Sequence, residues 1–182
     1  LKDYEPDGST AEISKMFDAL RSPLVALRAA VLERPPAPEL EGQFDPHLQL
    51  KLSQELAECF GYNMACGRID RAVHPFCSGT GADVRITTRI DPSDPLGCFY
   101  STIHEVGHGN YEQNIDQSYG FTPIGHGCSM GVHESQSRIC ENQLGRSEAF
   151  TSFIYGRMRD VFGSFGVASE RQFYQAVNRV SH

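Results

Sequence analysis

Apolar residues recur every three or four positions near the start of the chain, which is the spacing of one face of a helix. A capping box formed by Ser9 and Glu12 precedes this pattern, so the sequence predicts an amphipathic helix over residues 10–33. Pro23 lies inside the segment and is expected to kink or split it, because proline removes a backbone hydrogen bond. A proline-rich stretch then ends the helix.

A second helix is predicted over residues 45–61. Asp45 supplies an N-cap, Pro46 suits the first helical position, and Gly61 ends the segment. The apolar face consists of every fourth residue, namely Leu48, Leu52, Leu56 and Phe60. Because two amphipathic helices in succession can cover each other's apolar faces, we expect an antiparallel helical hairpin over residues 10–61.

One strand is predicted in the region 62–97, where glycine, proline, aspartate and threonine become frequent. Apolar and polar residues alternate here as in a strand with one buried face. The residues expected to face a core are Val84, Ile86, Thr88 and Ile90. Those expected on the polar face are Asp83, Arg85, Thr87 and Arg89. Such a face belongs either to a solvated edge strand or to a strand beside a binding site.

Helical patterns dominate the remainder of the chain, at 95–113, 131–145, 148–163 and from Ser169 to the C-terminus. The expected fold class is therefore mainly α with a small β-sheet. We expect residues 1–182 to form a single domain around one core. Its parts would be the hairpin at 10–61, the loop and strand region at 62–97, and the helices at 98–182, which contain the candidate metal site.

Composition excludes several classes of protein. The 182 residues are 40% hydrophobic, which is too apolar for a disordered chain. The net charge of −7 leaves no basic surface for a nucleic-acid partner. No apolar stretch is long enough to span a bilayer, so no membrane partner is expected. The six cysteines form no CxxC pair and follow no secretion signal, which points to free thiols in the cytoplasm.

The sequence HEVGH, which begins at His104, is an HExxH motif inside the helix predicted at 95–113. Residues four apart share one face of a helix, so the imidazoles of His104 and His108 can reach the same Zn²⁺. Glu105 would lie beside that ion as the catalytic carboxylate. The motif therefore predicts a zinc site built on one helix.

Glycines interrupt the same helix at Gly107 and Gly109. Each is less favourable than alanine in a helix interior by roughly 1 kcal/mol. Two residues that disfavour a helix therefore occur in the helix that is expected to carry the catalytic site. Close packing of a neighbouring backbone is the alternative explanation.

A catalytic zinc needs a third protein ligand and one open position. Glu134 is the first candidate, because it lies in a second helical segment that can cross the first and deliver its carboxylate. His126, Cys128 and His133 compete with it for the same role. A cysteine ligand would make the site more closed and structural in character.

Two histidines and a glutamate on one ion predict hydrolysis. Such an ion lowers the pKa of a water, Glu105 takes the proton, and the ion polarises a carbonyl group. A peptide bond is the natural substrate for this chemistry. Zn²⁺ is the expected cofactor, but the ligand types also admit Co²⁺ or Mn²⁺.

Four motifs in order resemble the carboxypeptidase Taq family of zinc metallocarboxypeptidases. They are HPF at 74–76, DVRITTR at 83–89, HEVGHGNYEQ at 104–113 and GVHESQSRICEN at 131–142, followed by GRS at 145–147. The resemblance covers essentially the whole chain and implies a mainly helical, zincin-like HExxH core with a small sheet beside a deep cleft. It also implies homodimers, peptide substrates, and a site made of His104, His108, Glu134 and Glu105.

The chain also departs from the family's pattern. Family members are much longer, and the IRxxAD and GxxQDxHW motifs that follow in them do not occur here. The arginine of IRxxAD is implied to grip the substrate's terminal carboxylate. We therefore expect a truncated member, the central portion of a longer enzyme, which agrees with a start at Leu1. Apolar faces uncovered around 10–33 and 148–180 would favour a homodimer or a larger species.

Three functional interpretations remain open at this point. The first is a metallocarboxypeptidase that releases C-terminal residues from peptides. The second is a metal-binding fragment of such an enzyme that cannot turn over, and the third is a zinc endopeptidase or aminopeptidase. Arg85 and Arg89 are candidate ligands for the substrate carboxylate, since an edge strand runs along the cleft in metallopeptidases of this kind. Ion pairs that support the fold are the alternative role for both.

Overall fold

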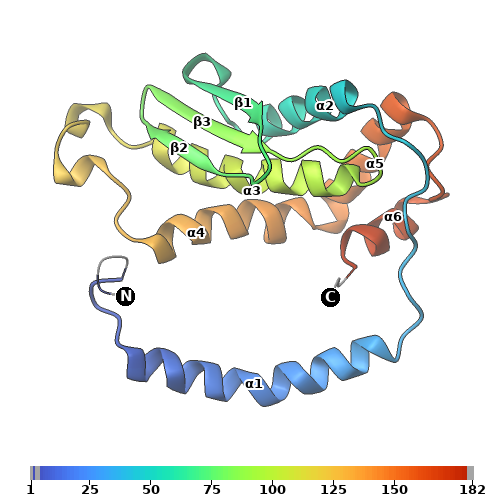
Figure 1. The fold of residues 1–182 in the computed structure, drawn as a ribbon, viewed down its shortest axis with the longest axis horizontal. Helices are drawn as coiled ribbons and strands as arrows, with labels where there is room; N and C mark the ends of the chain where they lie inside the picture. The colour runs from blue at the N-terminus through green and yellow to red at the C-terminus, as the bar shows by residue number, and fades with distance from the viewer. Residues whose placement is uncertain (1, 3–4, 180–182) are drawn as a thin grey trace.

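One helix, α3 (Pro95–Gln113), organises the fold, because it lies between a small β-sheet and a second layer of helices (Figure 1). The structure is a computed structural model that describes residue 2 and residues 5–179. Within that range the chain is mostly helical with a single three-stranded sheet, which confirms the predicted fold class. No helix in this range is both long enough and apolar enough to cross a membrane.

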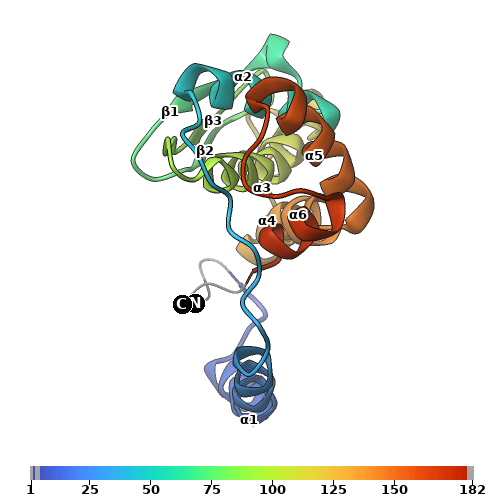
Figure 2. The same ribbon diagram turned by 90° about the vertical axis from the view of Figure 1, so that its right-hand side faces the viewer.

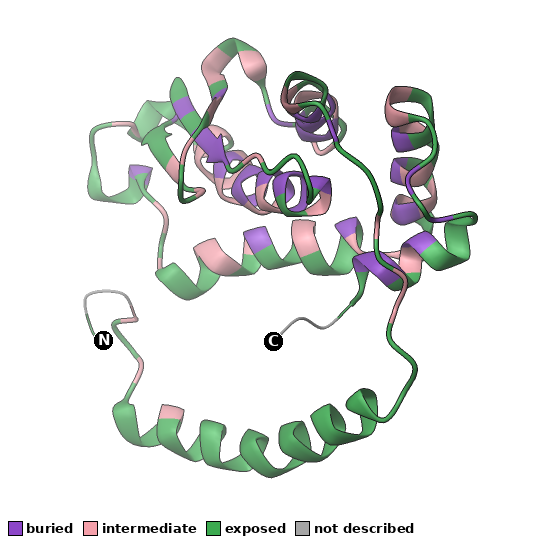
Figure 3. Ribbon diagram, turned by 45° about the vertical axis from the view of Figure 1, so that its right-hand side comes forward, coloured by how far each residue is buried: buried purple, intermediate pink, exposed green. Residues whose placement is uncertain are grey.

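Helix α1 (Thr10–Leu32) stands apart from the rest of the chain (Figures 1 and 2). It begins as predicted after Ser9, whose hydroxyl accepts a hydrogen bond from the backbone amide of Glu12. It runs through Pro23 without being split. No residue of α1 is buried, and Figure 3 shows the helix exposed along nearly its whole length.

The predicted hairpin of the first two helices is wrong. Helix α2 (Pro46–Cys59) starts as predicted after its N-cap Asp45, but it packs against α3 and buries Leu52 and Leu56 there. The connecting residues 33–45 lie outside any helix or strand and include three prolines, which hold a chain in extended conformations. This segment therefore carries α1 away from the body of the molecule and does not fold it back onto α2 (Figure 1).

The sheet consists of β1 (Gly67–Arg71), β2 (Cys77–Thr80) and β3 (Asp83–Thr88) in the order β1-β3-β2. Strand β3 runs parallel to β1 and antiparallel to β2, so it is the central strand. The expectation of an edge strand is therefore wrong. The predicted burial of Val84 and Ile86 is confirmed, because both side chains are fully buried.

Thr87 departs from the predicted alternation, because it is buried although its position in the pattern is on the polar face. The segment that ends at Phe76 covers it. The amide of Phe76 donates a hydrogen bond of 3.0 Å to the Thr87 hydroxyl, and the amide of Thr87 donates one of 2.9 Å to the Phe76 carbonyl. Arg85 is exposed as predicted and pairs with Asp83.

Two hydrophobic clusters hold the layers together. Val106 of α3 packs under the sheet in the smaller cluster, with Tyr62, Ile69 and Ile86. The larger cluster joins α2 and α3 to α5 (Glu148–Phe162) and α6 (Glu170–Val177). Both C-terminal helices begin directly after the predicted caps, Ser147 and Ser169. Helix α6 ends at Val177, and residues 180–182 lie outside the described part of the chain.

The predicted helix at 131–145 is two elements in the structure. Helix α4 (Met130–Arg138) continues directly into a π-helical segment, Ile139–Gly145. Together they lie along the side of α3 that faces away from the sheet (Figure 1). The Tyr100 hydroxyl donates a hydrogen bond of 2.8 Å to the carbonyl of Gly145, which ties the end of this segment to α3.

Candidate metal centre

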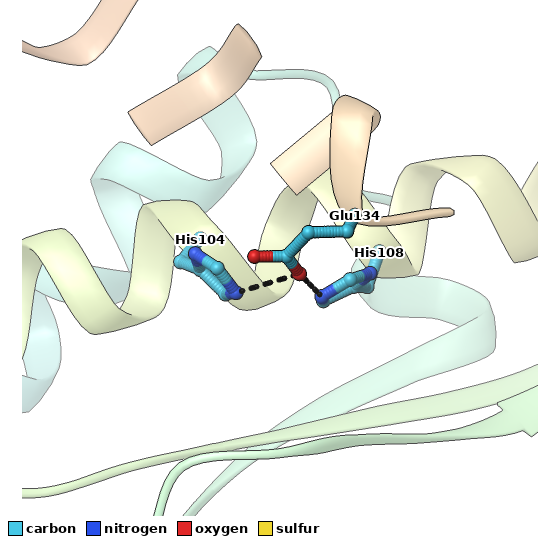
Figure 4. A group of neighbouring side chains, drawn as sticks. All are labelled: His104, His108 and Glu134. Carbon is cyan, nitrogen blue, oxygen red and sulfur yellow. Dashed lines mark ion pairs between the residues drawn. The ribbon is translucent and has the colours of Figure 1, made fainter. Parts of the chain in front are cut away.

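Two imidazoles and one carboxylate meet where α4 lies against α3. His104 and His108 are four residues apart on α3 and therefore share a face, with ring centroids 5.1 Å apart. Glu134 on α4 reaches between them (Figure 4). Its Oε2 atom is 3.2 Å from His108 Nε2 and 3.6 Å from His104 Nε2. The structure thus brings together the three residues that the sequence predicts as ligands.

This donor set fits a divalent cation. Each residue offers one ligand atom, and the three atoms lie within 4.8 Å of one another. Zinc bonds of about 2.0–2.2 Å at tetrahedral angles separate two ligand atoms by roughly 3.3 Å. The distances from Glu134 to the two histidines are close to that value. Imidazole nitrogen and carboxylate oxygen also suit Co²⁺ and Mn²⁺, so the ligands do not select one metal.

Glycine in α3 allows α4 to come this close. A Cβ atom at Gly107 would lie 2.5 Å from the Cα of Ser137 and 2.6 Å from the carbonyl oxygen of Gln136. A Cβ atom at Gly109 would lie 2.9 Å from the ring of Tyr62. Close packing therefore explains both glycines of this helix, and Gly107 connects that packing to the position of Glu134.

The carboxylate of Glu141 contacts Nδ1 of His104, which is the ring nitrogen that faces away from Glu134. Glu141 Oε2 lies 2.9 Å from His104 Nδ1, and this hydrogen bond raises the pKa of His104. Burial would raise the pKa of Glu141, but hydrogen bonds from His104 and Arg146 outweigh it and lower that pKa to about 2. Sequence reasoning missed Glu141.

The imidazole of His133 contacts Nδ1 of His108, which is the ring nitrogen that faces away from Glu134. His133 Nδ1 lies 2.7 Å from His108 Nδ1, and Glu112 Oε1 lies 2.8 Å from His133 Nε2. Burial, together with the nearby His133, lowers the pKa of His108. His133 competed with Glu134 as third ligand, but it lies behind His108 and not among the three donor atoms. Neither His126 nor Cys128 belongs to that group of donors.

Glu105 is one of the residues that line a cleft next to His104. Its residue surface is 7% exposed, and burial raises its pKa to about 7. The cleft has a volume of about 820 Å³ and is lined by Glu105 and His104 together with His74 and Pro75. A buried carboxylate at this position can accept a proton from a molecule held in the cleft.

The structure does not bring the two strand arginines to this cleft. Arg85 forms an ion pair of 2.8 Å with Asp83, and neither Arg85 nor Arg89 is among the described residues that line the cleft. Their role as ligands of a substrate carboxylate stays a prediction. The arginines that do line the cleft each pair with an acidic residue and are Arg138, Arg146 and Arg179.

A helix that presents two imidazoles and a buried carboxylate, crossed by a second helix that adds another carboxylate, has the site architecture of zinc metallopeptidases. The whole chain, residues 1–182, matches the carboxypeptidase Taq (M32) metallopeptidase family. The chain belongs to this family. Membership implies a divalent metal, and His104, His108 and Glu134 provide a group that can hold one.

The relatives that this chain matches in sequence are carboxypeptidases. The chain is 38% identical over 184 residues to thermostable carboxypeptidase 1 of Thermus thermophilus, and the match covers 99% of this chain and 36% of that protein. It is 35% identical over 180 residues to carboxypeptidase 1 of Bacillus subtilis, covering 96% of this chain and 36% of the relative.

Solved structures agree with these sequence matches. The crystal structure of the M32 carboxypeptidase from Deinococcus radiodurans R1 matches with a TM-score of 0.91 and 39% identity, over 99% of this chain and 37% of that one. Metallocarboxypeptidase 1 of Trypanosoma cruzi matches with a TM-score of 0.88 and 30% identity, over 100% and 37% of the two chains. The chain therefore spans little more than a third of the length of these relatives.

Proposed function

We propose that this chain carries the metal centre of a metallocarboxypeptidase and that it hydrolyses the C-terminal bond of peptides. The observation that carries the proposal is the group of His104, His108 and Glu134, together with a cleft lined by His104 and Glu105. Membership of the carboxypeptidase Taq (M32) family supports the same reaction. Because the chain spans about 36% of its curated relatives, its own activity needs a direct test.

The residues divide the work by position. His104, His108 and Glu134 would hold the cation, which supplies a Lewis acid that polarises the scissile carbonyl and activates water. Glu105 would accept the proton of the attacking water and return it to the leaving amine. Its near-complete burial keeps other solvent away from that carboxylate. The cleft of about 820 Å³ has room for the end of a peptide.

Metal analysis combined with a peptide assay tests this function. Glu134→Ala is expected to lose bound Zn²⁺ and peptide release together, because one of the three donors is removed. Glu105→Gln is expected to keep the metal and to lose about 10²- to 10⁴-fold in rate, which is the usual contribution of a general base. Glu58→Ala, an exposed carboxylate on α2, is the matched control and should change neither quantity.

Blocked peptides distinguish the possible reactions. An amidated C-terminus should stop a carboxypeptidase, an acetylated N-terminus should stop an aminopeptidase, and neither should stop an endopeptidase. Release from the free and the acetylated peptide alone is the expected result. Wild-type protein that retains metal and releases nothing would instead select the metal-binding fragment without turnover.

The groups that recognise the terminal carboxylate are a separate proposal. Arg85 and Arg89 are the candidates, and Arg85→Ala is expected to raise KM for peptides with a free C-terminus while kcat is largely kept. Unchanged KM and kcat would leave Arg85 as the ion-pair partner of Asp83 and nothing more.

We also propose that the chain acts in the cytoplasm. All six cysteines lie within the described residues and carry free thiols. Free thiols persist in a reducing compartment. Mass spectrometry of alkylated protein from cell extracts should therefore find the exposed Cys59 and Cys128 unpaired.

A further inference from the structure

Two consecutive residues of α4 contact the two ring nitrogens of His108. Glu134 faces its inner nitrogen, with Oε2 3.2 Å from His108 Nε2. The preceding residue, His133, faces its outer nitrogen, with 2.7 Å between the two Nδ1 atoms. Glu112 completes a chain of contacts, since its Oε1 lies 2.8 Å from His133 Nε2. Glu112 itself lies one helical turn beyond His108 on α3.

The geometry allows one arrangement of protons when His108 binds a cation. A ligating Nε2 carries no proton, so the neutral ring of His108 has its proton on Nδ1. That proton needs an acceptor, and His133 Nδ1 is the atom 2.7 Å away. His133 accepts only if its own proton is on Nε2, where it donates to Glu112. Glu112 thereby fixes the tautomer that makes His133 an acceptor.

The surroundings hold the His133 ring in this orientation. The side chains of His133 and Glu112 are 18% and 14% exposed. The ring of Tyr111 packs edge-on against His133, with centroids 4.9 Å apart. On another side, a Cβ atom at Gly127 would lie 2.9 Å from His133 Cδ2, so backbone closes in there. The ring therefore has little freedom to turn away from His108.

We propose that His133 and Glu112 form a positioning pair that orients His108 for cation binding and sets the affinity of the site. This inference rests on the proposed metal centre. It also gives the two metal imidazoles different support, because a carboxylate contacts His104 directly whereas an imidazole stands between His108 and its carboxylate. Such partners of ligating histidines typically contribute 10- to 100-fold in metal affinity.

Three variants of the full chain test the pair. His133→Phe keeps a ring but removes the acceptor, and it should weaken Zn²⁺ and Co²⁺ binding about 10- to 100-fold. His133→Asn can place its Oδ1 where Nδ1 stood, and should stay within about threefold of wild type because a hydrogen bond is retained. His47→Phe, on the exposed face of α2, is the matched control and should bind as wild type does.

The Glu112→Ala variant tests the contribution of Glu112 to metal affinity separately from that of His133. It should weaken binding severalfold in the wild-type background, because His133 loses the partner that fixes its tautomer. It should have little further effect in the His133→Asn background, because an amide oxygen needs no tautomer to accept. Affinities come from competition with a chromophoric chelator. The visible absorption of the Co²⁺ form reports the ligand geometry, and His133→Phe should shift it.

The outcomes are decisive in each direction. Unchanged affinity and Co²⁺ spectrum in His133→Phe would overturn the positioning role, and so would an equal loss in His133→Phe and His133→Asn, which would indicate packing alone. Melting of the metal-free variants shows whether the fold is kept. Wild-type protein that binds neither cation would overturn the metal centre itself and with it this role of the pair.

Discussion

A single missing side chain decides how near the two metal-site helices can come. Because a Cβ atom at Gly107 would overlap the backbone of Ser137 and Gln136, the Gly107→Ala variant must push α4 outward. We expect it to lower the free energy of unfolding by about 1–3 kcal/mol, as overpacked cores do. Glu134 moves with α4, so Zn²⁺ affinity should fall as well. Denaturant unfolding and chelator competition measure the two effects.

Gly156 offers the control for this substitution. It lies in the interior of α5, and a Cβ atom there would meet nothing within 4 Å. Gly156→Ala should therefore raise the free energy of unfolding by about 0.5–1 kcal/mol through helix propensity. If Gly107→Ala proved as harmless as Gly156→Ala, the approach of the two backbones would not be what positions Glu134.

Metal ligands could be predicted from the sequence where their proximity depends only on spacing along one helix. His104 and His108 share a face for that reason alone. Glu134 required the further assumption that a second helix crosses the first, and the structure brings it to the pair. The partners at Glu141 and His133 could not be predicted in the same way, because their contacts depend on the exact rotation of α4 against α3.

At the scale of elements, α4 is a short helix that carries Glu134 of the candidate metal centre and His133, which contacts His108. Its nine residues are too few for a stable helix in isolation, so its cap and its contact with α3 must hold it. The Ser129 hydroxyl accepts a hydrogen bond of 3.1 Å from the amide of Val132. We expect Ser129→Ala to cost about 1 kcal/mol of stability, the usual value of an N-cap.

The same substitution should also loosen the metal site, because Glu134 and His133 lie close to the turn that Ser129 caps. Ser129→Asp restores an acceptor and should recover both the melting temperature and the Zn²⁺ affinity. Calorimetry and metal titration of the two variants make the comparison. Equal behaviour of the alanine and aspartate variants would argue against a role for the cap.

Elements with strong local signals were predicted well, whereas pairing between elements was not. Caps and periodicity placed α2, α3 and α5 within a few residues of their observed bounds, and they placed the start but not the end of α6. Strands β1 and β2 are short and show no alternating pattern, since their order comes from pairing with β3. For the same reason β3 could be predicted as a strand, but its central place in the sheet could not.

At the scale of the whole molecule, the apolar face of α1 has no partner in the described part of the chain. Phe17, Leu20, Leu24 and Leu27 are 45–60% exposed. Contiguous apolar surface of this kind promotes association. We propose that the chain forms a homodimer or a larger species through α1, and light scattering at micromolar concentration should detect it.

Charged substitutions identify the face responsible. Leu24→Asp combined with Leu27→Asp should yield a monomer, because each places a carboxylate on the apolar side of α1. Lys15→Asp, another exposed position on α1, is the control and should leave association intact. A wild-type chain that is monomeric under these conditions would contradict the proposal.

The separation of α1 from the body has a consequence for how the molecule folds. A helix that buries no residue adds nothing to the cooperative unit formed by the sheet, α3 and the C-terminal helices. The melting of α1 therefore need not follow that of the body. The exposed residues 33–36 therefore separate α1 from the metal centre, whose three donors all lie on helices that share the core of the body.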